Sequence, residues 1–158
     1  MKILRWIDDY LEEYISLILL AIISCVMMIQ IIMRYVFNSS LTWAEELCRY
    51  SFIWIAFLGI GYTIKKGTML RIDIVMQYFP NKIKKIIDLI IQLITLVFFT
   101  YMFNNSIGVV KGIYYSGQIS PANGIPMFII YGSTSVGFLL AILRSIQSII
   151  ILLRKCNS

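Results

Sequence analysis

Two acidic and two basic side chains gather where the first long apolar segment of the chain ends and the second begins. Arg34 closes the first segment, and Glu45, Glu46 and Arg49 open the second, just after Trp43. Carboxylates inside a membrane could bind a cation or relay protons, because charges kept there at a cost usually serve transport. The same acids could instead pair with Arg49, which follows them by four and three residues on one helical face. We favour a structural clamp between helix ends, since two arginines balance the two carboxylates.

The length of the second apolar segment sets the depth of this cluster in a membrane. Its uncharged run, residues 50–64, has only fifteen residues, whereas an α-helix needs about 20 to cross the hydrocarbon core. About 20 residues counted back from Lys65, the next basic residue, reach Glu45. Both acids are therefore expected at or just inside the membrane boundary, each with a partner. Trp43 suits the aromatic belt of the same interface.

The composition of the chain is that of an integral membrane protein. Its 158 residues have a mean hydropathy of +0.83, and 14% are charged, against roughly 25% in soluble domains. The formal net charge of +6 does not indicate a nucleic-acid partner, because the basic residues flank apolar segments as the positive-inside rule describes. The chain has no histidine and three scattered cysteines. We therefore predict no metal site, no cofactor and no enzymatic activity.

Four apolar segments long enough to span a bilayer would position the charged cluster. Residues 65–85, after the second of them, carry six basic residues and one acid, which places that segment and both termini in the cytoplasm. Residues 2–14 have the pattern of an amphipathic helix in the interface, with Glu12 on its polar face. Arg144 is expected close to the inner interface. We predict a single-domain, all-α integral membrane protein with an interfacial helix at about 2–14, transmembrane helices at about 15–36, 45–64, 86–110 and 126–148, and an inner interfacial segment at about 69–80.

The predicted spans contain few groups from which a transport pathway could be built. Between the boundary charges they have only scattered polar residues such as Gln30, Gln92 and Thr95, which hydrogen bonds between helices can satisfy. We find no inverted repeat and no pair of interrupted helices, the usual signs of a transport site. The chain is therefore expected to be a partner of a transport protein, with a broad apolar face left for lipid or another subunit.

Several motifs with fixed spacing follow one another between residues 34 and 75. They are Arg34-Tyr35-Val36-Phe37, then Trp43 before Glu45-Glu46-Leu47 and Arg49, then Trp54 to Gly59, then Lys66-Gly67 through Asp73. Together with Pro126 and Tyr131 they resemble the small membrane subunit, of DctQ type, of tripartite ATP-independent periplasmic (TRAP) transporters. Met69 stands where that family often has histidine, and Ser135 where it often has proline.

The resemblance implies a scaffold in a transporter of the bacterial inner membrane. In that family a periplasmic substrate-binding protein delivers an organic acid, such as sialic acid or a C4-dicarboxylate, to a large DctM-type subunit that moves it inward with sodium. The small subunit braces the large one and needs no cofactor. Trp54, Phe57, Arg71 and Asp73 are then expected contacts of the large subunit or of phospholipid. The alternative is a self-sufficient oligomeric channel or exporter with the two acids, Glu45 and Glu46, as a charged ring.

Overall fold

The computed structural model describes residues 2–66 and 81–156, and within these ranges the side chains of residues 11–66, 83 and 86–153. The described part folds into four α-helices and contains no β-strand beyond a single isolated bridge. They are α1 (Lys2–Val36), α2 (Thr42–Lys66), α4 (Asn81–Ser116) and α5 (Met127–Cys156). Each helix includes a stretch long and apolar enough to cross a membrane. The predicted all-α membrane fold with four spanning helices is confirmed.

The helix ends follow local backbone preferences. The turn between α1 and α2 has Asn38 at a φ of 50°, a left-handed conformation that asparagine adopts more readily than most residues. Helix α4 continues to Ser116, beyond the predicted end of the third span near residue 110. It ends at Gly117, whose φ of 62° breaks the helix. Lys111 does not interrupt α4 because its side chain is exposed.

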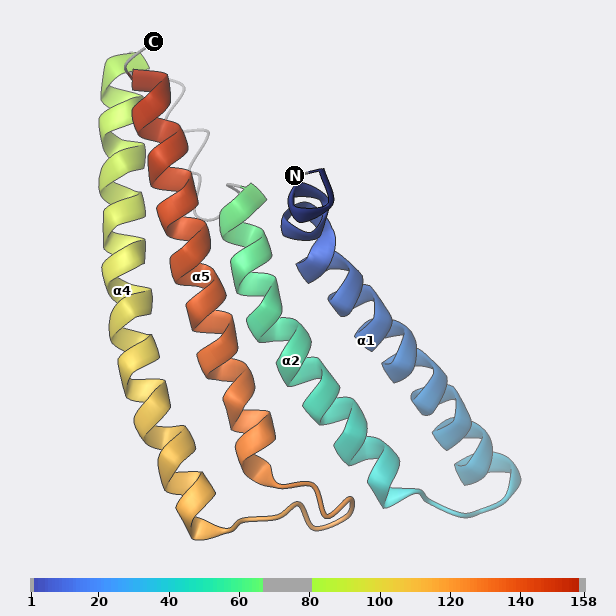
Figure 1. Ribbon diagram of the computed structural model, residues 1–158. Helices are drawn as coiled ribbons and strands as arrows, with labels where there is room; N and C mark the ends of the chain where they lie inside the picture. The colour runs from blue at the N-terminus through green and yellow to red at the C-terminus, as the bar shows by residue number, and fades with distance from the viewer. Residues whose placement is uncertain (1, 67–80, 157–158) are drawn as a thin grey trace.

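The first helix is longer than the predicted first span. Helix α1 runs without a break through both the predicted interfacial helix, residues 2–14, and the predicted span, residues 15–36. Figure 1 shows its first turns set at an angle to the remainder. The predicted inner interfacial segment, residues 69–80, lies outside the described residues.

The four helices form a single layer. Contacts join α1 to α2, α2 to α5, and α5 to α4, so the order across the layer is α1, α2, α5, α4 (Figure 1). The inner helices are the better covered: 28% of the apolar stretch of α2 and 22% of that of α5 are buried, against 6% in each of α1 and α4. Both connections, 37–41 and 117–126, lie at one end, here named the loop end. The beginning of α1 and the end of α5 lie at the other, the terminal end (Figure 1).

The centre of the layer is an apolar cluster shared by α2, α4 and α5. Its buried members are Ile64, Phe99 and Ala141. The ring of Phe138 packs between Phe99 and Phe57, at centroid distances of 5.9 and 5.6 Å. Helices α2 and α5 approach closely at Gly137, where an added Cβ would lie 2.7 Å from the Cβ and the backbone oxygen of Phe57. This glycine therefore sets how tightly the two inner helices pack.

Candidate functional site

At the loop end, the carboxylate of Glu46 ties α2 to the connection between α4 and α5. Glu46 is only 8% exposed. Its Oε1 accepts a hydrogen bond of 2.6 Å from the hydroxyl of Tyr50. Its Oε2 accepts bonds of 3.0 and 2.9 Å from the backbone N–H groups of Ala122 and Asn123, and one of 3.1 Å from Asn123 Nδ2. Hydrogen bonds to an ionised acceptor are about twice as strong as neutral ones, so this carboxylate anchors the loop.

The loop is shaped so that its amides face Glu46. The backbone N–H of Ser120 donates to Ile125 O at 2.9 Å, and that of Gly124 donates to Ser120 O at 3.0 Å. Gly124 has a φ of 63°, which favours glycine. Asn123 Nδ2 also donates to the backbone oxygen of Trp43 at 3.1 Å. These bonds hold the backbone in a tight turn independently of Glu46. Less conformational entropy is therefore lost when the loop amides bond to the carboxylate.

The predicted pairing of the acids with arginine is wrong. Arg34 and Arg49 are exposed, and neither forms an ion pair in the described part of the chain. Glu45 is also exposed, and its Oε1 accepts a 2.8 Å bond from Gln30 Nε2 on α1. Consecutive residues point about 100° apart around a helix, so Glu45 faces α1 while Glu46 faces the loop. Backbone amides satisfy the buried carboxylate without the cost of burying an arginine.

The other predicted site residues lie in different surroundings. The ring of Trp43 is 40% exposed at the loop end. Trp54 is half-buried, as is Phe57, whose ring packs edge-on against Phe138 inside the layer. Phe57 therefore contributes to the contact between α2 and α5. Arg71 and Asp73 lie outside the described residues.

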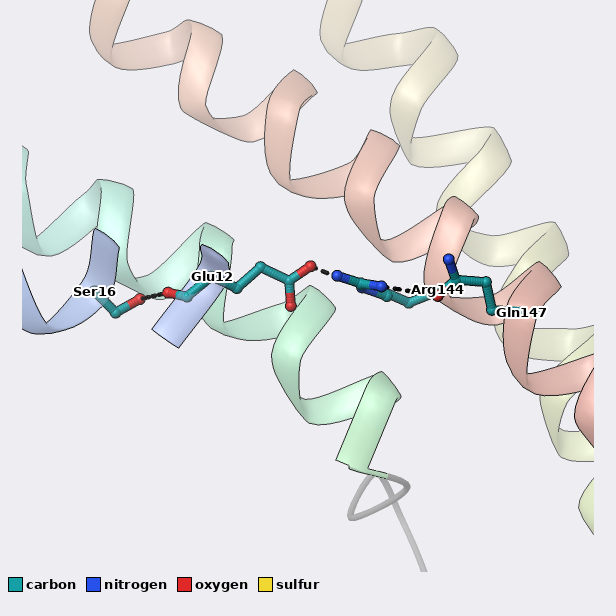
Figure 2. A network of polar contacts seen from close by, with 4 residues as sticks. All are labelled: Glu12, Ser16, Arg144 and Gln147. Carbon is teal, nitrogen blue, oxygen red and sulfur yellow. Dashed lines mark hydrogen bonds and ion pairs between the residues drawn. The ribbon is translucent and has the colours of Figure 1, made fainter. Parts of the chain in front are cut away.

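At the terminal end, a buried ion pair joins α1 directly to α5. Figure 2 shows Glu12 reaching across to Arg144, with 2.8 Å between Glu12 Oε1 and Arg144 Nε. Their side chains are 3% and 7% exposed. Arg144 also donates to Gln147 Oε1 at 2.8 Å, and Ser16 Oγ donates to the backbone oxygen of Glu12 at 2.8 Å. The pair is shielded from solvent. Burial strengthens the Coulomb attraction between the two charges, but removing them from water costs free energy.

A glycine of α2 leaves the space through which the ion pair forms. Helix α2 lies between α1 and α5 in the layer. A Cβ added at Gly61 would lie 3.4 Å from Glu12 Oε1 and 3.3 Å from Leu140 Cβ. The sequence predicted Glu12 on the polar face of an interfacial helix, whereas the structure buries its side chain against α5. The pattern within one helix cannot show that the opposite charge lies on a helix far along the chain, although an arginine within the last apolar span was a signal for a buried partner.

The described side chains offer no group of three His, Cys, Asp or Glu residues that could hold a metal ion. The charged groups act in helix-to-helix and helix-to-loop contacts, at the two ends of the layer. This arrangement stabilises a fixed shape.

Comparison with known proteins identifies the family. The profile of the tripartite ATP-independent periplasmic transporters, DctQ component, matches residues 23–155. The chain belongs to the DctQ family. This confirms the resemblance drawn from the motifs between residues 34 and 75. DctQ proteins are components of transporters and not enzymes, and this one is a multi-pass protein of the bacterial inner membrane with four spanning helices.

Individual relatives of this DctQ protein come from several bacteria. It is 32% identical to the ectoine TRAP transporter small permease protein TeaB of Halomonas elongata over 110 residues, 70% of this chain and 57% of TeaB. It is 27% identical to a putative TRAP transporter small permease protein of Haemophilus influenzae over 131 residues, 83% of this chain and 78% of that protein. It is 26% identical to the isethionate TRAP transporter permease protein DctMQ of Oleidesulfovibrio alaskensis, an alignment that covers 99% of this chain and 26% of DctMQ.

Proposed function

We propose that this DctQ protein braces a large DctM-type subunit that imports a carboxylate solute with sodium. A periplasmic binding protein would deliver the solute, and the sodium site would lie in the large subunit. The small subunit would contribute a rigid membrane scaffold, contacts to the large subunit and contacts to phospholipid, without a cofactor of its own.

The observation that carries this proposal is the single-layer arrangement of the four helices. The main helix contacts join neighbours in the order α1, α2, α5, α4, and the Glu12–Arg144 ion pair connects α1 to α5 past the end-region of α2. In the described part of the chain this single layer encloses no central lumen. A charged solute needs polar groups that face a shared cavity at membrane depth. The buried acids of the described part instead lie at its two ends, Glu12 at the terminal end and Glu46 at the loop end. Each has partners within the chain, which supports a structural role.

The polar groups deeper in the layer also act between helices. Ser106 and Ser135 lie on α4 and α5, and their hydroxyl oxygens are 2.9 Å apart. A hydrogen bond of this kind holds membrane helices together where lipid offers no alternative partner. Ser135 thus has a packing role at the position where the family often has proline.

The outer helices present wide apolar surfaces. On α1, Ile18 and Met28 are 60% and 67% exposed, and on α4, Ile94 and Val97 are 64% and 69% exposed. Because a single layer has two faces and two edges, it can contact lipid on one side and a larger membrane protein on another. Such a scaffold widens the membrane footprint of its partner.

The relatives support a larger partner and suggest the kind of solute. The chain aligns with about a quarter of DctMQ, which leaves the rest of that permease for a larger component. Names of other relatives refer to sialic acid, C4-dicarboxylates and ectoine. Sialic acid and C4-dicarboxylates are carboxylates, and we take this class as the expected cargo. Both termini are expected in the cytoplasm, because residues 65–85 carry six basic residues and one acid.

Reconstitution into vesicles tests the proposal. Four preparations are compared: the small subunit alone, the large subunit alone, both together, and both with the binding protein. We expect uptake of a carboxylate only in the last preparation, and only with an inward sodium gradient. An inward potassium gradient, the control, should not support uptake. A panel of sialic acid, succinate, ectoine and isethionate identifies the solute. Flux through the small subunit alone would overturn the scaffold role and support the oligomeric channel.

A further inference from the structure

Helix α4 has a second packing pattern on the side that faces away from α5. Toward α5 its contacts recur every seven residues, at Gln92, Phe99 and Ser106. Such a repeat is typical of helices that pack side by side at a small angle. Each residue turns the helix by about 100°, so positions two residues away point to the opposite side. There, positions spaced alternately by three and four residues are all exposed. We name them the outer seam: Ile94, Val97, Tyr101, Asn104, Gly108, Lys111 and Tyr115.

The amide of Asn104 lies in the outer seam at the depth of the hydrocarbon core. The uncharged run of α4, residues 89–110, has 22 residues, about 33 Å of helix, close to the roughly 30 Å of the core. Asn104 lies six residues, about 9 Å, inside the loop-end limit of this run.

No hydrogen bond satisfies the Asn104 amide within the part of the chain that the structure describes. Its neighbour differs, because Asn105 Nδ2 donates to Tyr101 O at 2.8 Å within the same helix. An amide that faces acyl chains without a partner is costly, since hydrocarbon offers no hydrogen bond. Amide side chains in membrane helices bond across to neighbouring helices. Asn104 therefore indicates that protein, and not lipid, covers the outer seam.

The exposed face of α1 lacks this conflict at Ser24. The Ser24 hydroxyl is exposed, but it donates to Leu20 O at 2.9 Å within its own helix. Around it the surface is apolar, with Ile18 and Met28 60% and 67% exposed. Of the two edges of the layer, α1 is thus suited to lipid and α4 to a protein partner.

Lys111 distinguishes a second copy of this chain from a different helix. It lies seven residues beyond Asn104 in the outer seam, where the uncharged run ends. Two copies share one orientation in the membrane, so a two-fold pair would set the two α4 helices parallel, with each residue opposite its equivalent. Lys111 would then face Lys111, and like charges in an interface repel. A different helix that presents a carboxylate at this depth would gain an ion pair.

We propose that the outer seam of α4 packs against a transmembrane helix of the large DctM-type subunit. That helix presents a hydrogen-bonding side chain to Asn104 and an acidic side chain to Lys111. Gly108 lies between them, and a Cβ added there would have nothing within 4 Å, so the partner helix can approach closely. This inference rests on the proposed function for the identity of the partner and adds the face that meets it.

Association of the two full-length subunits tests the outer seam. The large subunit carries an affinity tag, both subunits are co-expressed, and the small subunit retained on dilution in detergent is measured. Asn104→Leu should weaken association about tenfold, the effect of one or two hydrogen bonds between membrane helices. Asn105→Leu is the matched control and should leave association unchanged, because its amide bonds within α4. Lys111→Glu should weaken association more than Lys111→Gln, since it sets two acids against each other.

Photo-crosslinking locates the partner independently of affinity. With the native cysteines replaced by serine, Tyr101→Cys and Met28→Cys are each labelled with a thiol-reactive benzophenone in the complex. Tyr101→Cys should crosslink to the large subunit, and Met28→Cys on α1 should not. The thermal midpoint of the small subunit alone should not fall in any of these variants, because the replaced side chains are exposed.

Three outcomes would overturn the inference. They are unchanged association in Asn104→Leu, a crosslink to the large subunit from Met28→Cys in place of Tyr101→Cys, and a crosslink from Tyr101→Cys to a second copy of this chain. Each refutes the assignment of the α4 face and leaves the scaffold role intact. Absence of any association between the unsubstituted subunits would instead refute the proposed function, and this inference with it.

Discussion

Replacing Glu12 with glutamine removes the charge that Arg144 faces across α2. The two side chains are 3% and 7% exposed and 2.8 Å apart. Removing one partner of a buried ion pair typically costs about 3–5 kcal/mol, because the other charge stays buried and uncompensated. Arg144 keeps its bond to Gln147, and a long side chain near the end of a span can reach the headgroups. We therefore expect the lower end, about 3 kcal/mol of unfolding free energy.

Thermal unfolding of the purified chain in detergent measures this loss. A change of 1 kcal/mol shifts the midpoint by about 2–4 °C in a protein of 150–250 residues, so Glu12→Gln should lower it by about 6–12 °C. Glu13→Gln is the matched control, because the neighbouring carboxylate is half-buried and forms no ion pair in the described part of the chain. The control should change stability by at most about 0.5 kcal/mol.

A double variant separates the ion pair from general packing. Glu12→Leu combined with Arg144→Met replaces both charges with apolar groups of similar size. Buried pairs replaced in this way often lose little stability, so the double variant should be more stable than Glu12→Gln alone. Equal midpoints for Glu12→Gln and Glu13→Gln, or a double variant as unstable as the summed single variants, would refute the reasoning.

Other perturbations test the remaining contacts and the orientation. Glu46→Ala should cost about 2–3 kcal/mol in thermal unfolding, since it removes the charged acceptor of the loop hydrogen bonds, and bonds to charged groups contribute about 1.5–3 kcal/mol. Glu45→Ala, at an exposed residue, should cost far less, and equal effects would remove the anchor role. Gly137→Ala should destabilise the chain by about 1–3 kcal/mol through overpacking, because its Cβ would lie 2.7 Å from a backbone oxygen of α2. Gly132→Ala, with nothing within 4 Å of the added Cβ, should be neutral, and a similar loss in both would argue against a close approach at residue 137. With the other two cysteines replaced by serine, Cys156 should resist a membrane-impermeant thiol reagent in intact cells and react once the membrane is opened; labelling from outside would reverse the predicted orientation.

That the two acids of the loop-end cluster would have partners was predictable, but the identity of those partners was not. Counting residues back from Lys65 predicts both acids at the membrane boundary, each with a partner, and both do accept hydrogen bonds within the chain. Helical spacing then suggested Arg49, because such spacing describes only neighbours on the same helix. The observed donors, Ala122 and Asn123, are backbone amides in a loop more than 70 residues away. A backbone amide carries no side-chain signature, so no sequence pattern could point to it.

The sequence by itself determined the number of helices, the membrane environment and the family. These follow from hydropathy summed over windows of about 20 residues and from motifs between residues 34 and 75, both of which are local along the chain. Only the tertiary structure decided the single-layer order α1, α2, α5, α4 and the pairing of Glu12 with Arg144, 132 residues apart. Spanning helices are apolar around most of their surface, so hydropathy does not distinguish the face that meets another helix from the face that meets lipid. Close fits such as that at Gly137 determine which helix faces pack together, and a fit depends on the shapes of both helix surfaces.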